Sequence, residues 1–97
     1  MKLTVSNEGT THIIAIEGWL DTKTSTELAE QLEKVPEDAG ELILDVKEME
    51  YISSAGLRQI VTAYKQMNGH MKIRGIRPEI LDVMKMAGLD KKFTFED

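Results

Sequence analysis

The apolar run Glu41–Val46 constrains the fold more than any other segment. It reads ELILDV, which is short and strongly apolar, and it gives way to polar residues at Lys47. A run of this length and character is typical of a central strand that is covered on both faces, as in a parallel sheet. We therefore expect strands and helices to alternate around this segment.

A β-hairpin is expected before this central strand. Residues Lys2–Ser6 and Thr11–Glu17 have strand-like patterns, and the segment Asn7–Thr10 between them contains the asparagine and glycine of a tight reversal. The next segment, Gly18–Asp21, breaks the strand pattern and is predicted to be a loop.

Three amphipathic helices are expected, each with a recognisable start. The first opens at Thr24, which has capping-box spacing to Glu27; the second opens at Ser53 and Ser54, and the third at Pro78. The expected buried residues of each helix have helical spacing. They are Leu28, Leu32 and Val35 in the first helix; Leu57, Ile60, Val61 and Tyr64 in the second; and Ile80, Val83, Met84 and Ala87 in the third. The first helix should end at Val35.

Two further strands complete the expected order. Met71–Arg74 alternates apolar and basic residues, which suggests that one sheet face is partly solvated and that the helices gather mainly on the other face; Phe93–Phe95 is a candidate last strand. The order predicts one α/β domain spanning residues 1–97, with a mixed, mostly parallel sheet opened by an antiparallel hairpin.

Composition excludes several functional classes. A net charge of −5 argues against direct binding of nucleic acid or of an anionic membrane surface. The chain has no cysteine, and His12 and His70 lack ligand-like spacing, so we expect no metal and no cofactor. No segment has the length of a membrane span or the character of a signal peptide, so we expect no membrane insertion and a cytoplasmic location.

Three loops should meet at one edge of the sheet, because the loops that follow parallel strands emerge on the same side. They are Gly18–Asp21, Lys47–Ser54 and Gly75–Pro78. Ser53 and Ser54 lie in the middle loop, where they open a helix whose N-terminus favours negative charge. This edge is the predicted functional site.

The two serines allow two interpretations. Serine is a preferred N-cap residue, so both could simply satisfy the backbone at the helix start. Alternatively, one caps the helix and the other is exposed as a phosphate acceptor, where added charge would change the local electrostatics without refolding.

The surrounding residues also have alternative interpretations. Gly56 would allow close packing or the close approach of a partner, and Arg58 is either solvent-facing or paired with a phosphate on Ser54. Asp21 and Asp45 would bond to the nearby backbone or reach the serines. Trp19 is interpreted as a loop anchor, with an interface residue as the alternative.

Catalysis by the chain itself has little support. The sequence lacks Gly-x-Ser-x-Gly and offers no histidine base near the serines, and it has no Walker-type loop for a nucleotide. The serines are therefore interpreted as a recognition or modification site, and we expect no catalytic residue.

The chain resembles the STAS domain, the family of bacterial anti-sigma factor antagonists that also occurs at the ends of sulfate transporters. The resemblance covers almost the whole chain and rests on the Gly18-x-Leu20-Asp21 segment, the strand with Asp45, the signature Tyr51-Ile52-Ser53-Ser54-Ala55-Gly56-Leu57-Arg58, and Met86–Leu89. It departs from the commonest signature at Ser53, where an aspartate is usual, and at Ala55, where a second hydroxyl residue is usual.

This resemblance implies a function for the serine site. Ser54 aligns with the serine that is phosphorylated by an anti-sigma factor with serine kinase activity, and Ser53 is a possible secondary acceptor. The unphosphorylated antagonist would bind that anti-sigma factor and so free a sigma factor, and a PP2C-type phosphatase would restore it. The alternative is a non-phosphorylated STAS scaffold or a transporter-associated interaction module.

Overall fold

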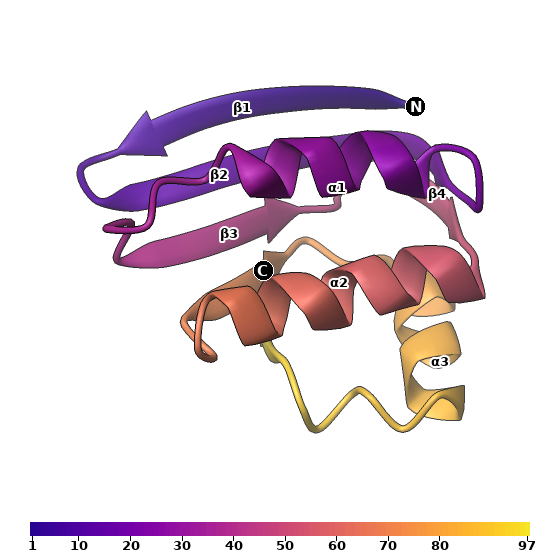
Figure 1. Ribbon diagram of the computed structural model, residues 1–97. Helices are drawn as coiled ribbons and strands as arrows, with labels where there is room; N and C mark the ends of the chain where they lie inside the picture. Colours follow the sequence, from indigo (N-terminus) through magenta and orange to yellow (C-terminus); the bar gives the residue numbers. More distant parts are fainter.

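The predicted central strand forms β3 (Glu41–Asp45) in a computed structural model that describes residues 1–97. Strand β3 lies between β2 (Thr11–Leu20) and β5 (Met71–Arg74) and runs parallel to both. The short strand β6 (Thr94–Glu96) pairs in parallel with β5. The predicted parallel arrangement around β3 is therefore confirmed (Figure 1).

The hairpin and the helices complete the predicted architecture. Strand β1 (Lys2–Glu8) pairs with β2 in antiparallel orientation, which gives the sheet order β1-β2-β3-β5-β6. The helices are α1 (Ser25–Glu33), α2 (Ser54–Gln66) and α3 (Pro78–Met86). Helices α1 and α2 lie side by side along the sheet, and α3 contacts Met49–Ile52, the strand that leads into α2 (Figure 1). Helix α1 stops shortly before the predicted end at Val35.

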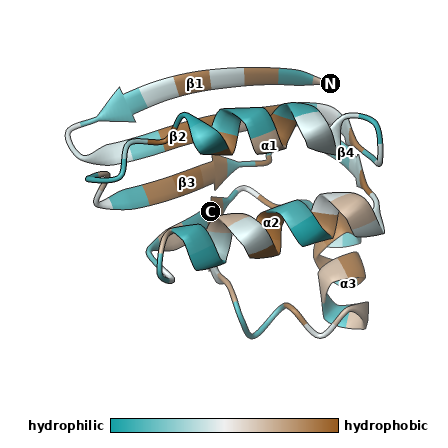
Figure 2. Ribbon diagram, in the orientation of Figure 1, coloured by the Kyte–Doolittle hydropathy of each residue, from teal (hydrophilic) through white to brown (hydrophobic).

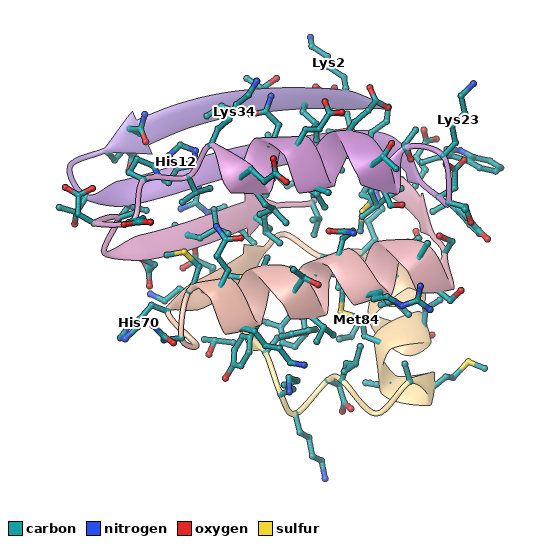
Figure 3. The ribbon with its side chains drawn as sticks, in the orientation of Figure 1. Lys2, His12, Lys23, Lys34, His70 and Met84 are labelled. Atoms are coloured by element: carbon teal, nitrogen blue, oxygen red, sulfur yellow. The ribbon has the colours of Figure 1, made fainter.

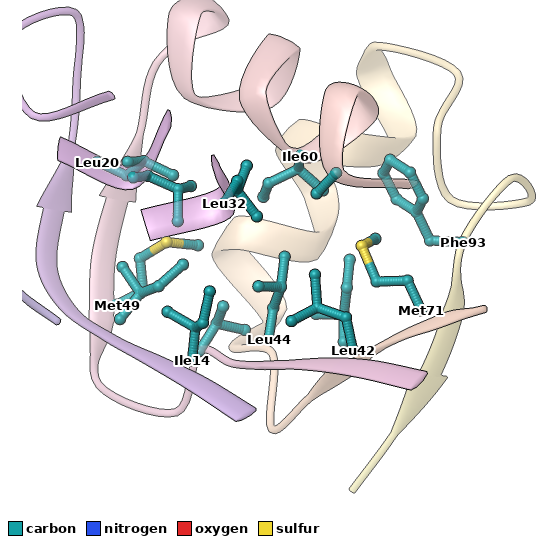
Figure 4. Close-up of a cluster of buried hydrophobic side chains, with 14 of the residues drawn as sticks. Ile14, Leu20, Leu32, Leu42, Leu44, Met49, Ile60, Met71 and Phe93 are labelled. Carbon is teal, nitrogen blue, oxygen red and sulfur yellow. The ribbon is translucent and has the colours of Figure 1, made fainter. Parts of the chain in front are cut away.

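One hydrophobic core lies between the helices and one face of the sheet. It contains 19 buried residues, including Ile14 and Leu44 from the sheet and Leu32 and Ile60 from the helices. Figure 4 shows these side chains pointing toward one another across the interior. Colouring by hydropathy likewise shows apolar residues concentrated along β2 and β3, whereas the outer turns of α1 and α2 carry hydrophilic ones (Figure 2).

The opposite face of the sheet is mixed: Ile13 and Ile43 are buried there, outside the core cluster, beside polar residues of the kind that the alternation in Met71–Arg74 predicted. Lys72 forms an ion pair with Glu41 at 3.5 Å, and Arg74 pairs with Glu96 at 3.0 Å. Each of these residues is only partly buried. The helices cover the face that carries the large core cluster, and the opposite face is only partly solvated.

A sixth strand, β4 (Met49–Ile52), was missed in the sequence and corrects two predictions. The predicted loop Lys47–Ser54 therefore contains a strand. Strand β4 pairs in parallel with the end of β2, so the segment Gly18–Asp21 is not a loop throughout: β2 continues through Leu20. The register shifts between Gly18 and Trp19, and Gly18 adopts φ +90°, a conformation that favours glycine. This irregularity hid the strand from a search for simple alternation.

Candidate functional site

The three predicted segments do meet at one edge of the sheet. The backbone N–H of Ser53 donates to the Leu20 carbonyl at 2.9 Å, and Gly18 N–H donates to the Glu48 carbonyl at the same distance. Arg77 Nε donates to the Lys47 carbonyl at 2.9 Å. These hydrogen bonds join the end of β2, the connection around β4 and the loop before α3. They therefore fix the backbone from which α2 begins.

Ser53 is the N-cap of α2. Its backbone is extended, with φ −96° and ψ 174°, and its Oγ accepts a hydrogen bond from Gly56 N–H at 3.2 Å. Its carbonyl accepts the N–H of Leu57 at 2.9 Å. Ser53 therefore has the structural role that serine commonly has at a helix start.

Ser54 differs from its neighbour in each of these respects. It is the first residue of α2, it is exposed, and its hydroxyl makes no hydrogen bond within the protein. The backbone N–H groups of Ser54 and Ala55 also have no partner, and the first turn carries no acidic residue. The hydroxyl of Ser54 is thus accessible at the positive end of a helix, where a phosphate would be stabilised.

Gly56 lies where no side chain fits. A Cβ built on it would stand 2.8 Å from the Leu20 carbonyl oxygen and 2.9 Å from Ile52 Cγ1. Gly56 is buried, so this contact is the packing of α2 against the ends of β2 and β4. Of the two interpretations of this glycine, the structure supports packing; Leu57 beside it packs against the core.

Arg58 is exposed, and its guanidinium forms no ion pair. It lies four residues after Ser54, a spacing that places both residues on the same side of the helix. The structure thus gives Arg58 the solvent-facing position, within reach of a group added to Ser54.

Asp21 organises the turn that leads into α1. Its Oδ1 accepts the N–H of Thr24 at 2.9 Å, while its own N–H donates to Thr24 Oγ1 at 2.8 Å. The backbone hydrogen bond from Thr24 is the main cause that lowers the pKa of Asp21 below its ordinary value. The reciprocal pair is therefore Asp21 with Thr24, and the predicted box of Thr24 with Glu27 is wrong, because Thr24 makes no side-chain cap bond to α1.

Asp45 serves the loop after β3. Its Oδ1 accepts the N–H of Lys47 at 3.2 Å, and its Oδ2 lies 3.4 Å from Lys47 Nζ. Neither Asp45 nor Asp21 hydrogen-bonds to a serine of the site. Both acids therefore follow the local-backbone interpretation rather than the alternative in which they reach the serines.

An exposed aromatic pair borders the site. Trp19 and Tyr51 face each other across β2 and β4 with ring centroids 4.9 Å apart, and their exposed fractions are 56% and 43%. The interpretation of Trp19 as an anchor is incomplete, because most of its side chain lies in solvent. Sequence reasoning gave Trp19 an interface role as an alternative, but it missed the pairing with Tyr51 because it missed β4.

The start of α2 is an open surface. The hollows of the molecule are lined by other residues, and none includes Ser53 or Ser54. Small molecules bind in concave pockets, whereas protein partners use flatter surfaces. The shape of this site thus suits a macromolecular partner.

Both histidines are remote from the site. His12 lies on the early part of β2, and His70 directly precedes β5, at the end of the sheet opposite to Lys23 (Figure 3). Neither imidazole is placed to activate Ser54. No helix of the protein is both long enough and apolar enough to cross a membrane.

Comparison with known proteins gives concordant matches. A family model described as the STAS domain matches residues 2–97. A Bordetella bronchiseptica protein with the provisional name anti-sigma factor antagonist BtrV is 28% identical over 92 residues, which cover 91% of this chain and 79% of that protein.

Solved structures share the same fold. An anti-sigma factor antagonist from Mycobacterium paratuberculosis superposes with a TM-score of 0.86 at 21% identity, covering 97% of this chain and 83% of that one. The Bacillus cell fate determinant SpoIIAA in its phosphorylated form superposes with a TM-score of 0.76 at 13% identity, covering 99% and 92%. At such identities the superpositions establish the fold alone.

Proposed function

The chain belongs to the STAS domain family, and from this premise and the geometry of Ser54 we propose that it is an anti-sigma factor antagonist switched by phosphorylation. In the unphosphorylated state it binds an anti-sigma factor that is also a serine kinase, and so releases a sigma factor. Phosphorylation of Ser54 breaks that complex, and a PP2C-type phosphatase restores it. The chain is then a ligand and a substrate rather than a catalyst, and it acts in the cytoplasm.

The observation that carries this proposal is the contrast between the two serines. Ser53 Oγ is held by Gly56 N–H, whereas Ser54 Oγ is exposed and free. A kinase needs a hydroxyl that it can reach and orient, so Ser54 is the acceptor and Ser53 is a poor secondary one. Phosphorylation of Ser53 would also cost the cap of α2.

The same geometry explains how a phosphate changes binding without refolding the domain. A phosphoserine carries close to two negative charges, and at Ser54 it would meet the free N–H groups of Ser54 and Ala55 and the unpaired Arg58. These groups would hold the phosphate on the surface. A partner that covers the neutral hydroxyl then has to accommodate a bulky dianion, which weakens the complex.

The relatives support the proposal. The Bordetella protein carries the name of an anti-sigma factor antagonist, and SpoIIAA has been solved in a phosphorylated form. The open shape of the site agrees with a protein partner.

The test combines phosphosite mapping with binding. Recombinant kinase-type anti-sigma factors from the source genome are incubated with the wild type and with Ser53→Ala and Ser54→Ala, and the products are mapped by mass spectrometry. We expect phosphate on Ser54, retained in Ser53→Ala and lost in Ser54→Ala. Ser54→Asp should bind the same anti-sigma factor more weakly than the wild type does.

Other results of these experiments would contradict the proposal. If no kinase of the set modifies Ser54 and Ser54→Asp binds as tightly as the wild type, phosphorylation control is wrong. Co-purification with membrane transport subunits and an unmodified Ser54 in cells would then support the scaffold or transporter-associated alternative.

A further inference from the structure

We propose that Trp19 and Tyr51 form an aromatic platform on which the anti-sigma factor anchors beside Ser54. This inference rests on the proposed function, because it names the surface by which the same partner binds. It adds a docking element that is separate from the phosphorylated hydroxyl.

The platform is a product of the irregular pairing between β2 and β4. After the register shift at Gly18, Trp19 lies opposite Tyr51 and Leu20 lies opposite Ile52. Leu20 and Ile52 turn into the core, so the two aromatic rings point outward and contact each other, with their centroids 4.9 Å apart and their planes tilted by 37°. The backbone thus presents both rings together on the outside of the sheet edge.

The packing of the folded chain gives no reason for both aromatic rings to be exposed. The other large hydrophobic side chains that are exposed, Val5 and Met86, belong to β1 and α3 and form no aromatic pair. Tryptophan and tyrosine side chains in contact offer a large apolar area with few rotatable bonds, and both residues are enriched in binding hot spots. An exposed apolar pair of this kind is typical of a surface that becomes covered.

The platform is continuous with the phosphorylation site. Tyr51 precedes Ser54 by three residues, so their Cα atoms are at most about 10 Å apart. On the other strand, the Leu20 carbonyl accepts the N–H of Ser53 and lies against Gly56. A kinase domain that binds over Ser54 would therefore lie close to the two rings.

Charge indicates the chemistry of the facing surface. Glu50, next to Tyr51, is exposed and has no ion-pair partner, and Glu48 is exposed although it pairs with Arg77 at 3.5 Å. The complementary partner surface is an apolar pocket for the rings with basic residues opposite Glu50. The partner that covers the platform is thus the kinase-type anti-sigma factor that recognises Ser54. It would bind the two rings in an apolar pocket with basic residues at its edge.

The experiment measures binding of the anti-sigma factors described above to Trp19→Ala and Tyr51→Ala. We expect the dissociation constant to rise about 30-fold for each variant, as for a hot-spot residue. Met86→Ala is the matched control, because it removes an exposed apolar side chain from α3 and should leave binding unchanged. Circular dichroism and thermal midpoints should match the wild type, since the rings lie outside the core.

Trp19 supplies an independent readout because it is the sole tryptophan of the chain. When the wild type or Met86→Ala is titrated with a tryptophan-free variant of the anti-sigma factor, its emission should shift to shorter wavelength and become less sensitive to acrylamide. Both changes report that the ring leaves water.

The outcomes separate the two proposals. If the wild type binds an anti-sigma factor but Trp19→Ala and Tyr51→Ala bind it equally well, the platform is wrong and the proposed function stands. If the wild type binds none, the proposed function fails and the platform falls with it. Self-association of the wild type that Trp19→Ala abolishes would assign the rings to a second copy of the chain and overturn the proposal.

Discussion

The two adjacent serines have different chemistry because the chain enters the helix between them. The extended backbone of Ser53 turns its hydroxyl back toward Gly56, whereas Ser54 already has helical geometry and points its hydroxyl to solvent. Ser53 stands where the related signature usually has an aspartate. A neutral cap satisfies the same N–H without placing a fixed negative charge beside a phosphate on Ser54.

The difference in hydrogen bonding predicts different effects on stability. Ser53→Ala should lower the free energy of unfolding by about 1 kcal/mol, because it removes a cap. Ser54→Ala should change it by less than about 0.5 kcal/mol, as for an exposed residue without a partner. Urea unfolding of both variants measures this. Equal losses would mean that Ser54 also supports the helix start, contrary to the geometry.

Gly56 permits a prediction whose sign is decided by packing. In an exposed helix, replacing glycine by alanine stabilises by roughly 1 kcal/mol. At Gly56 the new Cβ would meet backbone at 2.8 Å, so overpacking should win and Gly56→Ala should be destabilised by about 1–3 kcal/mol. Thermal unfolding of Gly56→Ala checks this, with Ser54→Ala as the control because it alters the same turn on its exposed side. If Gly56→Ala is more stable than the wild type, Leu20 and Ile52 can shift to accommodate the new Cβ at little cost.

At the scale of elements, sequence alone predicts what has a regular pattern. The hairpin, β3, β5 and the three helices follow from alternation, apolar runs and helix-start residues. Strand β4 does not, because its buried residues Met49 and Ile52 are spaced by three and its sole partner is the part of β2 beyond the Gly18 irregularity.

The same reasoning limits prediction of the site. The position of Ser54 was predictable, because a serine pair at a helix start is a local signal. The local role of Asp21 was predictable as well, because its partner Thr24 lies three residues away. The pairing of Trp19 with Tyr51, in contrast, depends on which strand lies beside β2. That contact is tertiary and leaves no local mark in the sequence.

In the turn between β2 and α1, Asp21 makes the free energy of unfolding depend on pH. Hydrogen bonds from Thr24 lower the pKa of Asp21 below the ordinary value of 3.8, so the folded state favours its carboxylate. The stabilisation is therefore present above the unfolded pKa and is lost as pH falls through the lower folded pKa. Asp21→Asn should be less stable than the wild type near neutral pH, and this difference should shrink below pH 3.8.

Two measurements check this prediction. Urea midpoints of the wild type and Asp21→Asn are compared from about pH 7 to about pH 3, with Glu27→Gln as a control at an exposed carboxylate in the first turn of α1. NMR titration of the Asp21 side-chain carbonyl should give a midpoint below 3.8. A midpoint above that value, or a difference that does not change with pH, would contradict the hydrogen-bonded geometry.

At the scale of the whole molecule, the core leaves little freedom for a switch that works by refolding. Helix α2 buries Gly56, Ile60 and Ala63, and Gln66 Nε2 donates to the Leu32 carbonyl at 2.7 Å, which ties its far end to α1. Moving α2 would open a cluster of 19 buried residues. A phosphate on the exposed side of its first residue acts on none of these contacts.

We therefore predict that Ser54→Asp and phosphorylated protein keep the amide hydrogen exchange of α2 beyond its first turn, and have a thermal midpoint no lower than that of the wild type, while partner binding weakens. Ser53→Ala is the control, because loss of the cap should speed exchange in the first turn and so shows that the assay is sensitive there. Faster exchange through Ile60 and Ala63 in the phosphorylated protein would mean that the charge loosens the helix. Unchanged exchange with lost binding would place the switch on the surface formed by Ser54, Arg58 and the aromatic platform, where charge added at one residue is read by a partner that covers all of them.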